Sequence, residues 1–168
     1  MSHSALNAIQ QIVKSEDRAL AYQFFLFFSR FEYALKRAGF VQANSRGEAY
    51  TDWECFAHKM AGLLRTHTDD YFKTAVAYIQ SHPPKKQVLL GERLAWDKDN
   101  FSDAFDLDRL LVLVRRIRNN LFHGGKFPEG QEDDVSRDRE LLKSGIAVLQ
   151  ACLESDPRLM TSFLQGLI

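Results

Sequence analysis

The sequence predicts an all-α protein, an antiparallel helical bundle of four main helices plus short accessory helices. Apolar residues recur with a helical period of about 3.6 residues, and no convincing alternating strand is found. The chain has no internal repeat and no low-complexity tract. Its 168 residues fit one domain, and its 45% hydrophobic content is enough for one sizeable core. We therefore expect residues 1–168 to form a single domain.

The first helices are defined by periodic apolar residues and by the residues that stop them. A short helix is expected over about 5–14, and a long one over about 16–38, where Gly39 can end it. The segment 44–47 is rich in turn residues and is predicted to be a loop.

The middle of the chain contains clear helix starts. Thr51 and Glu54 form a capping-box pattern, which predicts a helix that runs to about Arg65. A helix over about 68–80 should follow and end at the prolines of 82–86, because proline cannot continue the helical hydrogen bonds.

The region 87–100 fits either a helical turn or an ordered loop. Ser102 or Asp103 can cap the next helix, which is expected to run to about His123. The remaining elements are a loop at 127–130, a helix over about 133–154 and a short helix opened by Asp156 and Pro157.

Charge and composition exclude several classes of protein. The 22 basic and 22 acidic residues cancel, so any field that attracts nucleic acid must be local. Cys55 and Cys152 lie in apolar helical patterns and are expected to be buried thiols, which fits a reducing compartment. His58 and His67 are isolated, so no metal site and no cofactor are expected.

Membrane and secretion signals are not found in the sequence. The N-terminus lacks the basic and cleavage-like features of a signal peptide. The most apolar run, 24–28, is far shorter than the roughly 20 residues that cross a bilayer. We therefore expect a cytoplasmic protein.

The helix that ends near His123 carries a cation within its apolar stripe. On a helical projection Arg118 falls among Leu107, Leu111 and neighbouring apolar residues. A buried, unpaired guanidinium would cost several kcal/mol, so Arg118 needs a carboxylate or an opening to a cleft or interface. Glu32, at the edge of the Phe-rich stripe of 20–35, is the predicted partner. It either orients Arg118 for a reaction or only links two helices.

Two further polar residues stand near Arg118. Asn119 lies one helical turn before His123, so its amide can fix the imidazole tautomer. Arg118 and His123 converge only if the last turn unwinds, which Gly124 and Gly125 permit. Alternatively, His123 is simply a cation at the negative end of a helix.

Cations are concentrated along this segment, and carboxylates are absent from 109–127. Such a helix end is either a phosphate-binding surface or an ordinary solvated face. The candidate RNA or phosphate contacts are Arg115, Arg116, Asn120 and Lys126.

Arg118-Asn119-Asn120-Leu121-Phe122-His123 resembles the motif of the HEPN superfamily, in which four to six residues separate Arg from His and a polar residue often follows the Arg. The run 29–36 is similar to an early helix of prokaryotic HEPN proteins. The resemblance implies a HEPN-like helical bundle that homodimerises, with a composite active site. It further implies a metal-independent endoribonuclease, often a toxin of toxin–antitoxin or antiphage systems, with a possible cognate antitoxin protein.

Three functions follow from these observations. In the first, Arg118 and His123 cleave RNA through its 2′-OH, with Asn119 and Glu32 in support, and leave a 2′,3′-cyclic phosphate. In the second, the same basic terminus binds RNA or a nucleotide without catalysis. In the third, the protein is a structural or adaptor dimer.

Overall fold

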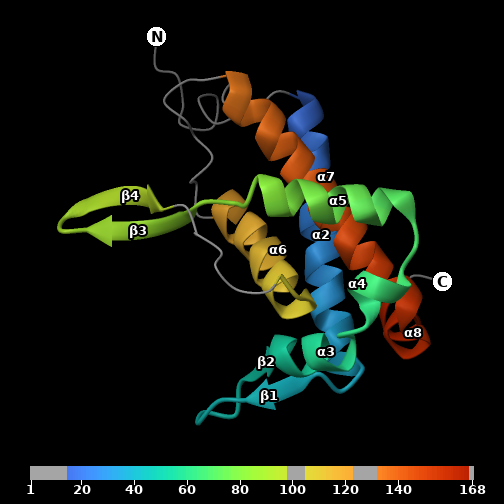
Figure 1. Cartoon of the computed structure of the whole chain (residues 1–168). Coiled ribbons are helices and arrows are strands. Elements are labelled where there is room, and N and C mark those ends of the chain that lie inside the picture. The colour runs from blue at the N-terminus through green and yellow to red at the C-terminus, as the bar shows by residue number, and fades with distance from the viewer. Residues whose placement is uncertain (1–14, 98–104, 123–131, 167–168) are drawn as a thin grey trace.

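The computed structural model describes residues 15–97, 105–122 and 132–166, which are mostly helical (Figure 1). The helices are α2 (Ser15–Arg37), α3 (Trp53–Lys59), α4 (Leu63–Thr66), α5 (Asp70–Ser81), α6 (Leu107–Phe122), α7 (Glu132–Ser155) and α8 (Pro157–Leu164). The strands are β1 (Val41–Ala43), β2 (Ala49–Thr51), β3 (Lys86–Leu90) and β4 (Arg93–Asp97).

The all-α prediction is wrong, because two small antiparallel sheets join the helices. Strand β1 pairs with β2, and β3 pairs with β4. The second hairpin occupies most of residues 87–100, for which the sequence allowed either a helical turn or an ordered loop. Its turn has Gly91 at φ 62° in the first central position, as type II′ hairpin turns require.

The main helices agree with the sequence. Helices α2 and α7 each begin and end within one residue of the predicted bounds. Gly39 has φ 97° and follows the end of α2, as expected for a helix stop. The loop at 44–47 is the turn between β1 and β2. The predicted helix at 5–14, the cap at Ser102 or Asp103 and the loop at 127–130 lie outside the described residues.

The start of α3 differs from the predicted capping box. Thr51 is the last residue of β2, and Asp52 caps the helix by accepting a hydrogen bond from the Cys55 N–H at 2.9 Å. This bond, together with one from the Gln42 amide, lowers the pKa of the Asp52 carboxyl. The predicted single helix to Arg65 is broken into α3 and α4.

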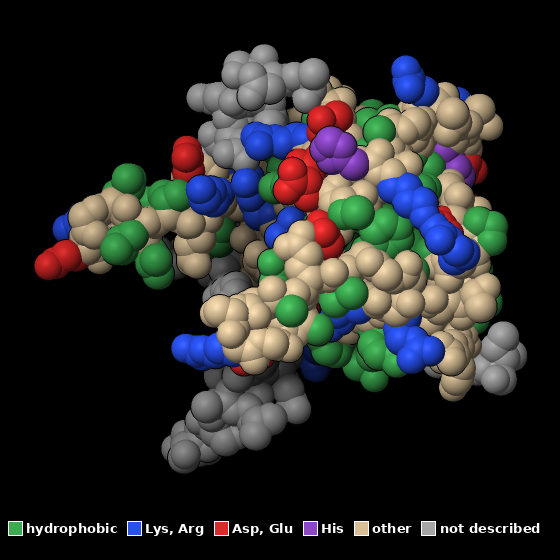
Figure 2. All heavy atoms as spheres, turned by 90° about the horizontal axis from the view of Figure 1, so that it is seen from below, with side chains coloured by type: hydrophobic (Ala, Val, Ile, Leu, Met, Phe, Trp, Pro, Cys, Tyr) green, Lys and Arg blue, Asp and Glu red, His purple; other side chains and the backbone are tan. Residues whose placement is uncertain are grey.

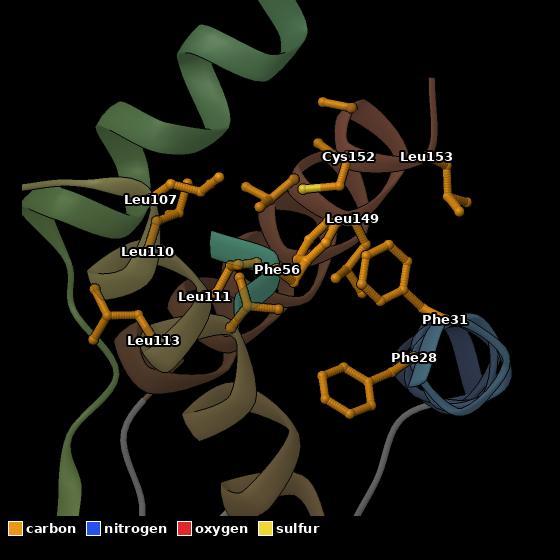
Figure 3. Close-up of a cluster of buried hydrophobic side chains, with 14 of the residues drawn as sticks. Phe28, Phe31, Phe56, Leu107, Leu110, Leu111, Leu113, Leu149, Cys152 and Leu153 are labelled. Atoms are coloured by element: carbon orange, nitrogen blue, oxygen red, sulfur yellow. The ribbon is translucent and has the colours of Figure 1, made fainter. Parts of the chain in front are cut away.

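The longest helices, α2 and α7, pack side by side, and α5 packs against α7 and runs across it instead of alongside (Figure 1). Figure 3 shows rings from α2 and α3 meeting leucines of α6 and α7 in the core. Helices α2 and α7 pack tightly at Gly145, where an added Cβ would lie 2.7 Å from Cε2 of Phe24. Gly145 therefore lets the buried Phe24 ring press against the backbone of α7.

Helix α8 is fixed at both ends by side chains. The buried Asp156 accepts hydrogen bonds from the Arg158 and Leu159 N–H groups at 2.9 and 3.2 Å. At the other end, Arg30 of α2 donates from Nε to the Phe163 carbonyl at 2.7 Å. These bonds satisfy backbone groups that a helix terminus leaves unpaired.

The two thiols lie in different surroundings, which corrects one prediction. Cys152 is buried, and burial raises the pKa of its thiol to about 12, but Cys55 is exposed. We expect a thiol reagent to label Cys55 at once and Cys152 only when the chain unfolds, since the reagent needs an accessible thiolate. Counting the fast-reacting thiols in the native protein and in Cys55→Ser checks this. Equal rates for both thiols would contradict it.

Candidate functional site

The predicted apolar stripe of α6 is confirmed by the burial of its residues. The candidate polar side chains on this helix make two separate sets of contacts. The buried members of the stripe are Leu107, Leu110, Leu111, Val114 and Ile117. Arg115 and Asn119 are exposed, whereas Arg116, Arg118 and Asn120 are half-buried. The contacts of these five side chains differ, and they divide the predicted site into two parts.

Arg118 rests on an aromatic ring of α2. Its Cζ lies 5.7 Å from the centroid of Phe28, and its Nη1 donates to Oδ1 of Asn119 at 3.1 Å. The ring face is electron-rich, so it offsets part of the cost of desolvating the guanidinium. The structure thus brings together Arg118 and Asn119, two residues that the sequence placed in one site.

Arg115 repeats this arrangement one helical turn earlier. Its Cζ lies 5.5 Å from the centroid of Trp53, and the Trp53 ring stacks on Phe28 with centroids 5.7 Å apart. Both rings are buried, with 6% and 2% of their surface exposed. Phe28 and Trp53 therefore form an aromatic platform that holds two guanidinium groups on the same side of α6.

The sequence predicts that Arg118 pairs with Glu32, whereas the contacts given above join Arg118 to Phe28 and Asn119. Within the described ranges, the ion pairs are Lys59–Asp156, Lys143–Glu140 and Arg158–Asp156. The expected pair between Glu32 and Arg118 is not among them. Glu32 lies on α2 one turn after Phe28, so the helix from which the sequence predicts a partner is the one that Arg118 contacts.

Arg116 and Asn120 point to the segment that joins α5 to β3. Arg116 Nη1 donates to the Pro84 carbonyl at 3.3 Å, and Asn120 Nδ2 donates to the Lys85 carbonyl at 2.9 Å. From α7, Arg137 Nη2 donates to the Pro83 carbonyl at 2.6 Å. We call these three bonds to consecutive carbonyls the carbonyl clasp. Arg116 and Asn120, which the sequence predicts to contact phosphate, thus hold the segment before β3 in place.

The remaining candidates follow α6 directly. His123 and Lys126, with the Gly124 that should unwind the last turn, lie outside the described residues. Helix α6 continues through Phe122, so its end carries Arg118 within its last two turns.

No group of three or more His, Cys, Asp or Glu side chains in the described ranges is placed to hold a metal ion. Nor does any helix there have the length and apolar character needed to span a membrane.

Comparison with protein-family models, curated proteins and solved structures gives no match for this chain.

Proposed function

We propose that this chain is a HEPN-type, metal-independent endoribonuclease whose working pair is Arg118 and His123. The observation that carries the proposal is the pair of guanidinium groups on the aromatic platform, next to Asn119 at the end of α6. His123 follows one residue after the last helical position. A guanidinium can stabilise the charge that develops on a scissile phosphate, and an imidazole can transfer the proton in RNA cleavage.

The platform supports phosphate binding in a physical way. A cation–π contact involves the face of a guanidinium, whereas phosphate oxygens are bound by the N–H groups in its plane, so the two kinds of contact are geometrically compatible. Arg115 and Arg118 are one turn apart on the same face of α6, a spacing at which both can reach one phosphodiester backbone.

The proposed reaction follows from these roles. The His123 imidazole takes the proton from a ribose 2′-OH, and the 2′ oxygen attacks the adjacent phosphorus. The guanidinium of Arg118 stabilises the negative charge that develops on the phosphoryl oxygens. The P–O5′ bond breaks, and the protonated imidazole of His123 gives its proton to the leaving 5′ oxygen. The products are a 2′,3′-cyclic phosphate and a 5′-hydroxyl.

The biological setting is part of the same proposal. The protein acts in the cytoplasm in a toxin–antitoxin or antiphage role, as a homodimer with a composite site, and a cognate antitoxin protein restrains it.

A second candidate function is RNA binding without cleavage. It is favoured because binding requires only the cations on the platform. Arg115 and Arg118 are held there by their cation–π contacts with Trp53 and Phe28. An adaptor role would require neither cleavage nor RNA affinity.

One experiment separates these functions. Labelled RNA is incubated with the protein in EDTA, and binding is measured in parallel with a 2′-O-methyl RNA of the same sequence, which lacks the nucleophile. We expect EDTA-resistant cleavage with cyclic-phosphate ends. His123→Ala should slow it by about 10²- to 10⁴-fold and leave binding unchanged, since the imidazole acts on the proton.

Arg118→Ala should weaken both cleavage and binding, because the guanidinium contacts the phosphate. Arg65→Ala, which removes an exposed cation from α4, serves as the matched control and should change neither. Circular dichroism of each variant checks that it folds. Binding without cleavage would establish the second function, and the loss of both activities in the wild-type protein would leave the adaptor role.

A further inference from the structure

The β3–β4 hairpin projects from the helices (Figure 1), and it carries strongly exposed apolar side chains. Leu89, Leu90 and Leu94 are 67%, 66% and 72% exposed, and Trp96 is 41% exposed. Hydrophobic side chains gather over this projection in the space-filling view (Figure 2). A surface of this kind on a projecting element marks an interaction site.

The strand register sorts these residues onto two faces. Directly opposite residues share a face, so Leu89 with Leu94 and Gln87 with Trp96 form one face, which is exposed. The other face carries Val88 with Ala95, which are half-buried, and the pairs Lys86–Asp97 and Leu90–Arg93 at its ends.

The backbone of β4 also has hydrogen-bonding capacity on its outer edge. Leu90 and Arg93 close a two-residue turn, so they form a hydrogen-bonded pair, and the pairs alternate from there. The N–H and C=O groups of Leu94 and Trp96 therefore point away from β3. Within the described ranges, β3 is the only strand that pairs with β4.

We propose that β4 pairs with β4 of a second copy of this chain, antiparallel and centred on Ala95. Leu94 then exchanges backbone hydrogen bonds with the partner's Trp96, and Arg93 lies opposite the partner's Asp97. Two hairpins become one four-stranded sheet, whose two apolar faces of Leu89, Leu94 and Trp96 are continuous. The inference concerns an interface and does not depend on RNA cleavage.

Charge complementarity selects this register. Antiparallel pairings that use the outer N–H and C=O groups can be centred on residue 94, 95 or 96. Only the pairing centred on Ala95 places Arg93 beside the partner's Asp97, and the two-fold symmetry makes this contact twice. Opposite charges that face each other across strands stabilise the pairing, whereas like charges oppose it.

The edge of β3 is less suitable for self-pairing. A pairing of β3 with itself, centred on Val88, would set Lys86 opposite the partner's Leu90 and Gln87 opposite the partner's Leu89. This pairing forms no pair of opposite charges, and it places the ammonium group of Lys86 opposite an apolar side chain. The β4 edge is therefore the one that fits a second copy, and its two-fold symmetry closes the assembly at two chains.

Disulfide trapping tests the register directly. In a Cys55→Ser background, Ala95→Cys would place two thiols at a non-hydrogen-bonded pair, where Cα atoms are about 4.5 Å apart. That spacing lies in the range for a disulfide, about 4.4–6.8 Å. Mild oxidation should give a disulfide-linked dimer. Val88→Cys, the opposite residue on β3 with similar burial, is the matched control and should not be cross-linked. Equal cross-linking of both variants, or none for Ala95→Cys, would overturn the proposal.

Charge reversal tests the interface without a covalent bond. Arg93→Glu and Asp97→Arg should each weaken dimerisation by about tenfold or more in sedimentation velocity, because each places like charges at both ends of the pairing. The double variant should restore the wild-type affinity to within about threefold, since the pairs are reversed and again opposite. A wild-type protein that stays monomeric at every concentration, or a dimer that neither reversal weakens, would show that the second copy does not dock here.

Discussion

Gly145→Ala is expected to destabilise the protein by about 1–3 kcal/mol, the range for overpacking a core. On an open helix the same change would stabilise by about 1 kcal/mol, because alanine is the better helix former. Here the new methyl carbon would lie 2.7 Å from Cε2 of Phe24, whose ring is fully buried between α2 and α7. The ring cannot turn away without displacing its neighbours, so the steric effect outweighs helix propensity.

Denaturant unfolding measures this effect, and each kcal/mol should lower the melting temperature by roughly 2–4 °C in a chain of this size. Gly62→Ala is the matched control, because its nearest neighbour would be 4.0 Å away and its φ of −74° suits any residue. It should be neutral or stabilising. Phe24→Leu should reduce the cost of Gly145→Ala in the double variant by making room for the methyl group. A stability of Gly145→Ala equal to that of Gly62→Ala would refute the close packing.

The second large effect is expected for Arg137→Met, which removes one bond of the carbonyl clasp. Arg137 donates a charge-assisted hydrogen bond to the Pro83 carbonyl at 2.6 Å, and such bonds contribute about 1.5–3 kcal/mol. Methionine retains most of the apolar stem but has no donor, so the Pro83 carbonyl loses this partner. We expect the loss of unfolding free energy to fall in that range.

Lys143→Met on the same helix is the control for this prediction. Lys143 forms an exposed pair with Glu140, and such pairs contribute about 0–1 kcal/mol. Hydrogen exchange should localise the effect of Arg137→Met to the amides of β3 and β4, because the clasp holds the root of that hairpin. Uniform faster exchange over all helices, or a stability loss no larger than that of the control, would show that the clasp does not hold the segment.

The sequence is sufficient to predict the long helices but not the hairpins. The helical period and the caps locate α2 and α7 to within a residue at each end, because burial on one face repeats along many turns. The strands have three or five residues, and β3 places Leu89 and Leu90 on opposite faces, both exposed. Buried and exposed residues do not alternate there, so the apolar pattern of the sequence does not indicate a strand. The Gly91-Glu92 turn was the signal that was present.

The candidate site shows a similar division. The motif identifies Arg118 and Asn119, which the structure joins by a hydrogen bond. Their surroundings were not predictable, because a projection assigns a residue to a face and does not say which group of a neighbouring helix meets it. Phe28 lies one turn from the expected Glu32. The acceptors of Arg116 and Asn120 are backbone carbonyls, which every residue possesses and no sequence pattern distinguishes.

The carbonyl clasp anchors the β3–β4 hairpin at its base. Its root is bonded to two helices by Arg116, Asn120 and Arg137, and its strands of five residues extend roughly 16 Å beyond that root. A rotation of α6 at the root is therefore magnified at the tip in proportion to that length. Because Arg116 and Arg118 lie on opposite sides of the same helical turn, α6 contacts both the base of the hairpin and the aromatic platform.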